Sequence, residues 1–178
     1  MIKTEKTGKT GKNFSDFALA GFFAALIFVA TAYLPRIPIG SGGYIHAGDT
    51  IVYLAASFLP RRLAMAAGGL GGALADVLSG FALWAPFTLF IKMALALPFT
   101  DRSEKLLCAR NIAALFAAFP VTVGGYYAAE WILTGSSSVP LVSLPYNALQ
   151  AAGSAVLYFC IAAQMDRARI KSRLRPNR

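Results

Sequence analysis

Six apolar stretches alternate with short segments that are polar or rich in glycine and proline. The run 17–34 is uncharged over 18 residues, and the run 131–165 holds no Asp, Glu, Lys, Arg or His in 35 residues. A helix of about 20 apolar residues spans the hydrocarbon core of a bilayer. The pattern therefore predicts an all-α membrane protein with six transmembrane helices, at 16–34, 49–59, 63–80, 86–98, 111–133 and 146–165.

Basic residues gather at alternate turns between these stretches. Fifteen of the 17 lysines and arginines precede the first helix or follow the second, fourth or sixth. Because cytoplasmic segments of membrane proteins are rich in Lys and Arg, this alternation predicts that both termini are cytoplasmic. It also accounts for the formal net charge of +9 without a nucleic-acid partner.

The chain divides by composition into three parts. We expect a basic cytoplasmic N-terminal segment (1–15), a six-helix membrane domain (16–166) and a basic cytoplasmic tail (167–178). The N-terminal segment is expected to be disordered or to lie on anionic headgroups. Outer loops are expected at 39–48 and 135–145, and the four glycines of the first loop suit a lid over a site.

Ionisable side chains stand out in the otherwise apolar stretch 42–94. They are His46, which is the only histidine, and Asp49, Asp76 and Lys92. A charged group at membrane depth costs on the order of 2.5–3.5 kcal/mol on insertion scales. Such groups persist where a cavity, a partner or a ligand offsets the cost, so we expect a binding site here.

Further polar and aromatic residues complete the predicted site. The orientation of the helices brings them toward the outer surface, although they come from separate segments of the chain. The candidate substrate-binding residues are Tyr44, His46, Asp49, Asp76, Ser79, Trp84, Lys92, Tyr126, Glu130, Asn147 and Gln150.

Each of these candidates also has a structural explanation. Asp76 and Lys92 lie on consecutive helices and could form a buried ion pair. His46 and Asp49 could cap the second helix. The aromatic candidates also suit an interfacial aromatic belt, the glutamate suits a solvated helix end, and the two amides suit contacts between helices.

The sequence contains no recognisable catalytic constellation. We find no trusted Ser/His/Asp spacing, no GxxxxGK[ST] motif and no cluster of metal ligands. Cys108 and Cys160 are not expected to form a disulfide, because the compartment predicted for the first of them is reducing. We therefore expect no cofactor, no metal site and no ATPase activity in this chain.

Two motifs resemble those of a known family. The second helix opens with Tyr44-Ile45-His46-Ala47-Gly48-Asp49. Residues 71–80 read GGALADVLSG and are followed by Trp84-Ala85-Pro86 and Ile91-Lys92. Over about 17–165 the chain resembles the substrate-binding S component of energy-coupling factor (ECF) transporters, which import vitamins into prokaryotic cells.

The resemblance implies a membrane subunit that captures a small water-soluble vitamin or precursor from outside and delivers it by reorienting in the lipid bilayer. It implies a transmembrane T component and two ATPase subunits as partners in the plasma membrane, with Ala20 and Ala24 contacting the T component. From spacing alone, packing within the chain explains these small residues more simply. The motif around Asp76 most resembles members that handle pyridoxine or thiamine precursors such as hydroxymethylpyrimidine.

Two other functions are compatible with apolar helices that carry a few charges. One is a membrane-embedded enzyme acting on lipid or prenyl substrates, with aspartate and histidine as catalytic groups. The absence of paired carboxylates and of a DxxxD-type motif argues against it. The other is a solitary ion-coupled carrier with Asp76, Lys92 and Glu130 as a relay. Internal repeats would favour a carrier, and the sequence shows none.

Overall fold

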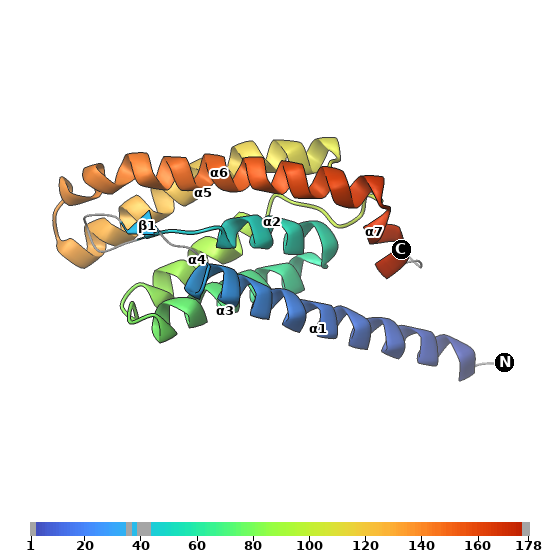
Figure 1. The fold of residues 1–178 in the computed structure, drawn as a ribbon. Coiled ribbons are helices and arrows are strands. Elements are labelled where there is room, and N and C mark those ends of the chain that lie inside the picture. Colours follow the sequence, from blue (N-terminus) through green and yellow to red (C-terminus); the bar gives the residue numbers. More distant parts are fainter. Residues whose placement is uncertain (1–2, 35–36, 39–43, 176–178) are drawn as a thin grey trace.

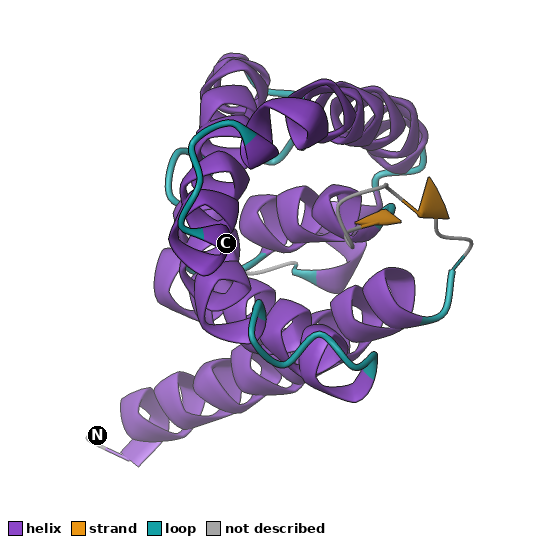
Figure 2. Ribbon diagram, turned by 90° about the vertical axis from the view of Figure 1, so that its left-hand side faces the viewer, coloured by secondary structure: helices purple, strands orange, loops and turns teal. Residues whose placement is uncertain are grey.

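The computed structural model describes residues 3–34, 37–38 and 44–175, with side chains over 14–34 and 46–175. Helices make up most of this part of the chain, as Figure 1 and Figure 2 show. They are α1 (Lys3–Ala32), α2 (Gly48–Phe58), α3 (Arg61–Leu78), α4 (Ala85–Ala96), α5 (Ala109–Thr134), α6 (Val139–Arg167) and α7 (Ile170–Leu174). Two-residue strands, β1 (Ile37–Pro38) and β2 (Tyr44–Ile45), pair in antiparallel fashion.

The elements define two ends of the molecule (Figure 1). The strand end holds β1, β2, the α3–α4 turn (79–84) and the α5–α6 turn (135–138). The terminal end holds the α2–α3 turn, the α4–α5 loop (97–108), α7 and the start of α1. The start of α1 and the whole of α7 therefore lie at the same end.

The predicted helices agree with α2 to α5 to within two residues at each boundary. Two helices begin earlier than expected. The backbone of α1 is helical from Lys3, although we expected disorder or a surface segment there. α6 begins at Val139, so most of the predicted loop 135–145 is helix. Pro140 lies in its first turn, where a missing N–H costs nothing, and the helix continues through Pro145.

α2 is the central element of the fold. It packs against α1, α3, α4 and α6, and ten of its 11 residues are buried. Its apolar side chains face all directions, as expected for a helix enclosed by others. Near its middle the ring of Tyr53 stacks on Phe99 at 5.2 Å between centroids. Residues on α2 are therefore held from several sides, and that includes the polar ones near its two ends.

Glycines on α3 allow its neighbours to approach closely. A Cβ atom at Gly71 would lie 2.6 Å from the carbonyl oxygen of Ala24, and one at Gly72 would lie 3.0 Å from Cγ of Lys92. The predicted small-residue face of α1 thus turns at least partly inward. Ala20 is only 9% exposed and Ala24 is half-buried.

The outer surface of the protein is largely apolar. Three helical segments are long and apolar enough to cross a membrane, namely 14–32 of α1, α5 and α6. Less than a third of each is buried inside the protein, and α4 is a shorter apolar helix. Large side chains point outward, with Phe116 77% exposed and Ile132 67% exposed. Such a surface suits contact with lipid and not with water.

Candidate functional site

A buried ion pair between α2 and α4 lies at the centre of the candidate site. Lys92 Nζ contacts Asp49 Oδ1, and both side chains are fully buried. Asp49 stands in the first turn of α2, where the helix dipole favours a negative charge. Gly72 on α3 has no side chain and so leaves room for the aliphatic stem of Lys92. Two desolvated charges are tolerated because each serves as the counterion of the other.

Gln150 extends this ion pair to α6. Its Nε2 donates to Asp49 Oδ2 at 2.9 Å, and its Oε1 accepts from the backbone N–H of His46 at 3.2 Å. Both carboxylate oxygens of Asp49 are therefore engaged, one by a cation and one by an amide. The result is a continuous polar network that joins α4, α2, α6 and the segment leading into α2.

His46 adopts a defined orientation at the start of α2. Its Nδ1 accepts from the backbone N–H of Gly48 at 2.9 Å, so this nitrogen carries no proton. The ring thereby satisfies an amide near the helix start, as predicted for His46. The alternative in which the Asp49 side chain caps α2 was wrong, because its carboxylate faces Lys92 and Gln150 instead. A Cβ at Gly48 would lie 2.8 Å from Nδ1, so only glycine fits.

Aromatic rings extend the network toward the strand end. Lys92 Nζ lies 5.6 Å from the centroid of the Tyr126 ring on α5, a distance at which a cation is attracted to the ring face. The Tyr126 ring in turn lies 6.5 Å from Trp84, the residue just before α4, with 44° between the ring planes. Both rings are partly exposed, so they offer apolar surface beside the buried charges.

The alternative in which Lys92 forms a buried ion pair with Asp76 was wrong. Among the described residues, the ion pair of Lys92 is with Asp49. Asp76 is buried on α3, one helical turn beyond Gly72, and it interacts electrostatically with Tyr126. The sequence favoured Asp76 because α3 and α4 are consecutive, whereas the fold inserts the enclosed helix α2 beside α4.

Three predicted residues lie apart from this network. Glu130 is 2% exposed and accepts from Ser143 Oγ at 3.1 Å, so the alternative of a solvated helix end was wrong. In the described part of the chain, no hydrogen bond joins Ser79 or Asn147 to the network, and both are half-buried. The side chain of Tyr44 and residues 39–43 of the predicted lid lie outside the described residues.

Two hydroxyl groups near the site were not predicted. Thr50 Oγ1 donates to the carbonyl oxygen of Ser154 at 3.2 Å and ties α2 to α6. Thr31 on α1 is 1% exposed, adjoins Gly48, and has no hydrogen-bond partner for Oγ1 within the described residues. Polar side chains within apolar helices were the available signal, because each needs a partner at membrane depth.

Comparisons with known proteins give two matches. A curated protein of Pyrococcus woesei, described as "Uncharacterized protein in gap 3'region", is 48% identical over 63 residues. The match covers 35% of this chain and 42% of that protein, so the chain spans less than half of its length. Residues 12–167 match the family described as "ECF-type riboflavin transporter, S component".

The family match runs from within α1 to the end of α6 and so includes every residue of the polar network. S components are subunits of transporters and not enzymes, which excludes the lipid-modifying enzyme considered above. They are membrane proteins with several spans, in agreement with the apolar helices found here. The chain therefore belongs to the ECF-type riboflavin transporter S component family.

Proposed function

We propose that this protein is the substrate-binding subunit of an ECF-type importer and that it takes up a vitamin at its strand end. The buried network of Lys92, Asp49 and Gln150 is the observation that supports this most directly. Charged groups inside membrane proteins mark substrate or ion pathways, because a purely structural role seldom offsets their cost. The family match supports the same function independently.

We further propose that the six helices α1 to α6 all cross the plasma membrane of a prokaryote. The three longest apolar segments can each span it, and the shorter α2, α3 and α4 are enclosed between them or packed beside them. The basic terminal end would face the cytoplasm and the strand end the outside. The domain limits 1–15, 16–166 and 167–178 are part of this proposal.

Cysteine labelling tests the orientation. Cys108 and Cys160 are first replaced by serine, because Cys160 is exposed and would react itself. A cysteine at Ser137 should then react with an impermeant maleimide in intact cells. A cysteine at Glu104 should react only after the membrane is opened. The reverse pattern would contradict the orientation and, with it, capture from outside at the strand end.

The substrate is proposed to be a small vitamin with a flat heterocycle. Trp84 and Tyr126 offer ring surface for stacking, and the adjacent network offers a carboxylate, an ammonium group and an amide. Pyridoxine or a hydroxymethylpyrimidine-like precursor is favoured by the motif around Asp76. Riboflavin is a second candidate, favoured by the description of the matching family.

Mass spectrometry of the small molecule released from purified protein identifies the substrate. Isothermal titration with riboflavin, pyridoxine and hydroxymethylpyrimidine then ranks the three on ligand-free protein. We expect the protein to bind one of the three much more tightly than the other two. Recovery of a lipid or prenyl compound, with no binding of any vitamin, would contradict the proposal.

Thr31 provides a test of the binding pocket itself. Its buried hydroxyl has no partner within the described residues, and a ligand group could supply one. Thr31→Val keeps the shape and should not lower the thermal unfolding midpoint, because no hydrogen bond among the described residues is lost. Loss of one hydrogen bond to ligand, about 0.5–1.5 kcal/mol, should weaken affinity roughly two- to tenfold. Unchanged affinity would remove Thr31 from the pocket.

The proposed partners are a transmembrane T component and two ATPase subunits, which would drive reorientation of this subunit. Ala20 and Ala24 are the predicted contact, but their burial against α3 limits what they present to another chain. We propose that the exposed residues Gly21 and Ala25, on the adjacent side of α1, complete the contact.

Replacing Gly21 and Ala25 together by leucine should block assembly with a T component and leave vitamin binding intact. The matched change Ala20→Leu should instead destabilise the isolated subunit, because Ala20 belongs to the core. Co-purification with the partner chains and titration of the vitamin distinguish the two effects. Normal assembly of the Gly21→Leu/Ala25→Leu protein would mean that another face of the subunit contacts the T component.

A further inference from the structure

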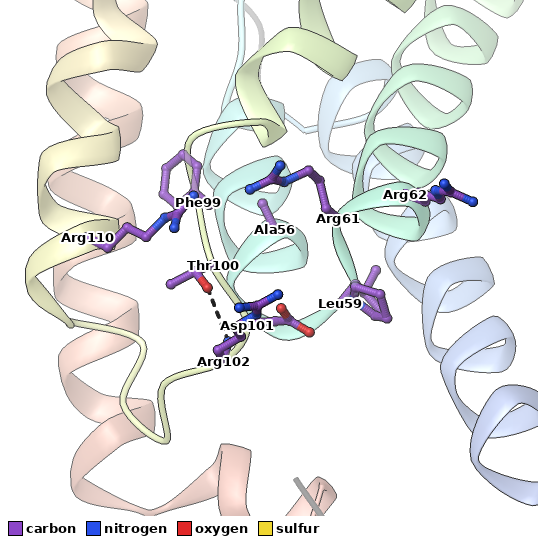
Figure 3. Close-up of a pocket in the computed structure, with 10 residues that line it drawn as sticks. Ala56, Leu59, Arg61, Arg62, Phe99, Thr100, Asp101, Arg102 and Arg110 are labelled. Atoms are coloured by element: carbon purple, nitrogen blue, oxygen red, sulfur yellow. Dashed lines mark hydrogen bonds between the residues drawn. The ribbon is translucent and has the colours of Figure 1, made fainter. Parts of the chain in front are cut away.

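A cavity lies at the terminal end, far along α2 from the polar network. It occupies about 660 Å³ between the α2–α3 turn and the α4–α5 loop (Figure 3). Leu59 and Phe99, both buried, are part of its lining. The lining also contains arginines from three places in the chain, namely Arg61 and Arg62 on α3, Arg102 in the loop and Arg110 on α5.

The cavity has an excess of positive charge. Figure 3 shows the side chains of Arg61 and Arg110 directed toward the space between α3 and α5, whereas Arg62 points away from it. Asp101 is the only acidic residue of the lining, and Arg175 on the other side lies 4.0 Å from its Oδ2. Asp101 thus also faces a cation outside the cavity, and the lining carries four arginines against this one aspartate.

The first turn of α3 adds backbone donors to the same lining. Pro60, Arg61 and Arg62 form this turn, and Pro60 as N-cap residue offers no capping side chain. The first turn contains no acidic residue either. The leading N–H groups of a helix have no partner within it, and the helix dipole makes this end attractive to anions. Helix N–H groups and guanidinium groups together make the usual environment of a bound phosphate.

We propose that this cavity binds a phosphate group, and that its source is the glycerophosphate headgroup of an anionic lipid in the cytoplasmic leaflet. All basic residues of the lining are arginines, whose planar donor pairs match phosphate oxygens better than lysine does. Basic pockets between helices on the cytoplasmic side suit anionic headgroups. The phosphate site stands independently of the vitamin site, whereas the lipid source rests on the orientation under the proposed function.

Native mass spectrometry of the detergent-solubilised full chain tests the proposal. The protein is titrated with phosphatidylglycerol, with phosphatidylcholine of the same acyl chains, and with inorganic phosphate. The test variant is Arg61→Gln/Arg102→Gln, because the described residues show no hydrogen bond from either side chain. The matched control is Arg62→Gln, which removes a charge from the same turn of α3 but from a lining residue whose side chain points away from the space between α3 and α5 (Figure 3).

We expect wild-type protein to bind phosphatidylglycerol in preference to phosphatidylcholine. Each arginine near a membrane surface contributes about 1 kcal/mol to anionic lipid binding, so the double variant should bind roughly 30-fold more weakly. The control should change far less. Thermal unfolding and vitamin titration show whether the double variant folds. The lipid titration does not depend on the vitamin site, so it can be interpreted even if wild-type protein binds no vitamin.

The outcomes separate the two sources of phosphate. Tight binding of inorganic phosphate, lost in the double variant and without a preference for phosphatidylglycerol, would support the phosphate site and assign it to a soluble ligand. Equal binding of the two lipids together with no binding of phosphate would overturn the proposal. So would a double variant that binds every anion as well as wild type does.

Discussion

The two ends of α2 carry polar clusters of opposite kinds. Near the strand end the cluster is charged, and it consists of Lys92, Asp49 and the amide of Gln150. Near the terminal end the cluster is neutral, and it consists of Ser57, Asn111 and Tyr158. Both clusters join α2 to neighbouring helices, and both are buried.

The neutral cluster is satisfied by groups of the chain itself. Ser57 Oγ and Tyr158 OH lie 2.8 Å apart, and Asn111 Nδ2 reaches Ser57 Oγ at 3.2 Å. Asn111 also donates to the carbonyl oxygens of Thr100 and Leu106 at 3.0 Å and accepts from the N–H of Thr100 at 2.8 Å. These bonds fasten the α4–α5 loop to α2, which is a complete structural role.

The comparison suggests why the strand end uses charges. A neutral cluster joins helices at a lower desolvation cost than an ion pair does. The chain uses such a cluster near the terminal end, where the ion pair of Arg175 with Asp16 keeps some exposure, and accepts a fully buried ion pair near the strand end. A ligand that needs a carboxylate and an ammonium group at the strand end gives a reason for this difference.

The largest effect is expected when one member of the ion pair is removed. Asp49→Asn leaves the ammonium group of Lys92 buried without its counterion. Lys92→Met likewise leaves the carboxylate of Asp49 buried without a cation. Each single change should lower the free energy of unfolding by about 3–5 kcal/mol. The double change removes both charges and should recover much of this loss. Thermal unfolding of wild type, the two single variants and the double variant in the same detergent measures these differences in stability.

Vitamin affinity of the same four proteins shows whether the pair has a function. If the charges hold the ligand, affinity should remain low in the double variant although stability returns. Losing a charged hydrogen bond costs about 1.5–3 kcal/mol, or roughly 10- to 150-fold in Kd. If a stable double variant binds the vitamin as tightly as wild type does, the ion pair has only a structural role. The two clusters of α2 would then not differ in function.

Asn111→Leu should give the next largest effect. It removes the side-chain contacts of Asn111 with Ser57, Thr100 and Leu106 and leaves backbone groups of the α4–α5 loop without partners. We expect a loss of about 1–3 kcal/mol in unfolding free energy. Vitamin affinity of the folded protein should stay within about twofold of wild type. A tenfold loss of affinity would show that the two ends of α2 are coupled.

The fold was largely predictable because the apolar stretches are separated by clear breaks. The exceptions are instructive. α6 starts at Val139 because a proline in the first turn of a helix is harmless, although prolines and serines in a row also suit a loop. The central position of α2 could not be predicted, because its short length indicates neither which helices enclose it nor on which sides.

The candidate site was predicted in composition but not in connectivity. His46, Asp49, Lys92 and Gln150 stood out because polar groups are costly in apolar sequence, and the structure joins them in one network. Asp76 was the wrong partner for Lys92, because the partner was assumed to come from the helix next to α4 in the sequence. Tertiary packing decides which carboxylate a buried ammonium group meets, and a single sequence carries no signal for that choice.

Glycine substitutions on α3 and α6 should have smaller and opposite effects. Gly71→Ala would bring a Cβ atom to 2.6 Å from the backbone of α1, so the two helices must separate. We expect a loss of about 1–3 kcal/mol from overpacking. The Cβ atom added by Gly153→Ala on α6 has nothing within 4 Å. This change should raise the unfolding free energy by up to about 1 kcal/mol, because alanine has a higher helix propensity than glycine. Unfolding midpoints that move in the same direction would contradict the close packing of α1 on α3.

The smallest effect is expected from the titration of Lys171 at the terminal end. Its ammonium group donates to the carbonyl oxygens of Ser57 at 2.7 Å and Ser103 at 2.6 Å. Burial lowers the pKa of Lys171 to about 8, below its ordinary value of 10.5. Between these two values the folded protein gives up the proton while the unfolded chain keeps it, so stability should rise with pH in this window. The neutral amine still has two N–H donors for the two carbonyl groups.

The difference in unfolding midpoint between wild type and Lys171→Met should therefore increase from pH 7 to pH 10. A constant difference would mean that the amine keeps its proton throughout. Vitamin affinity should not follow this titration, because Lys171 lies at the opposite end of α2 from the charged cluster.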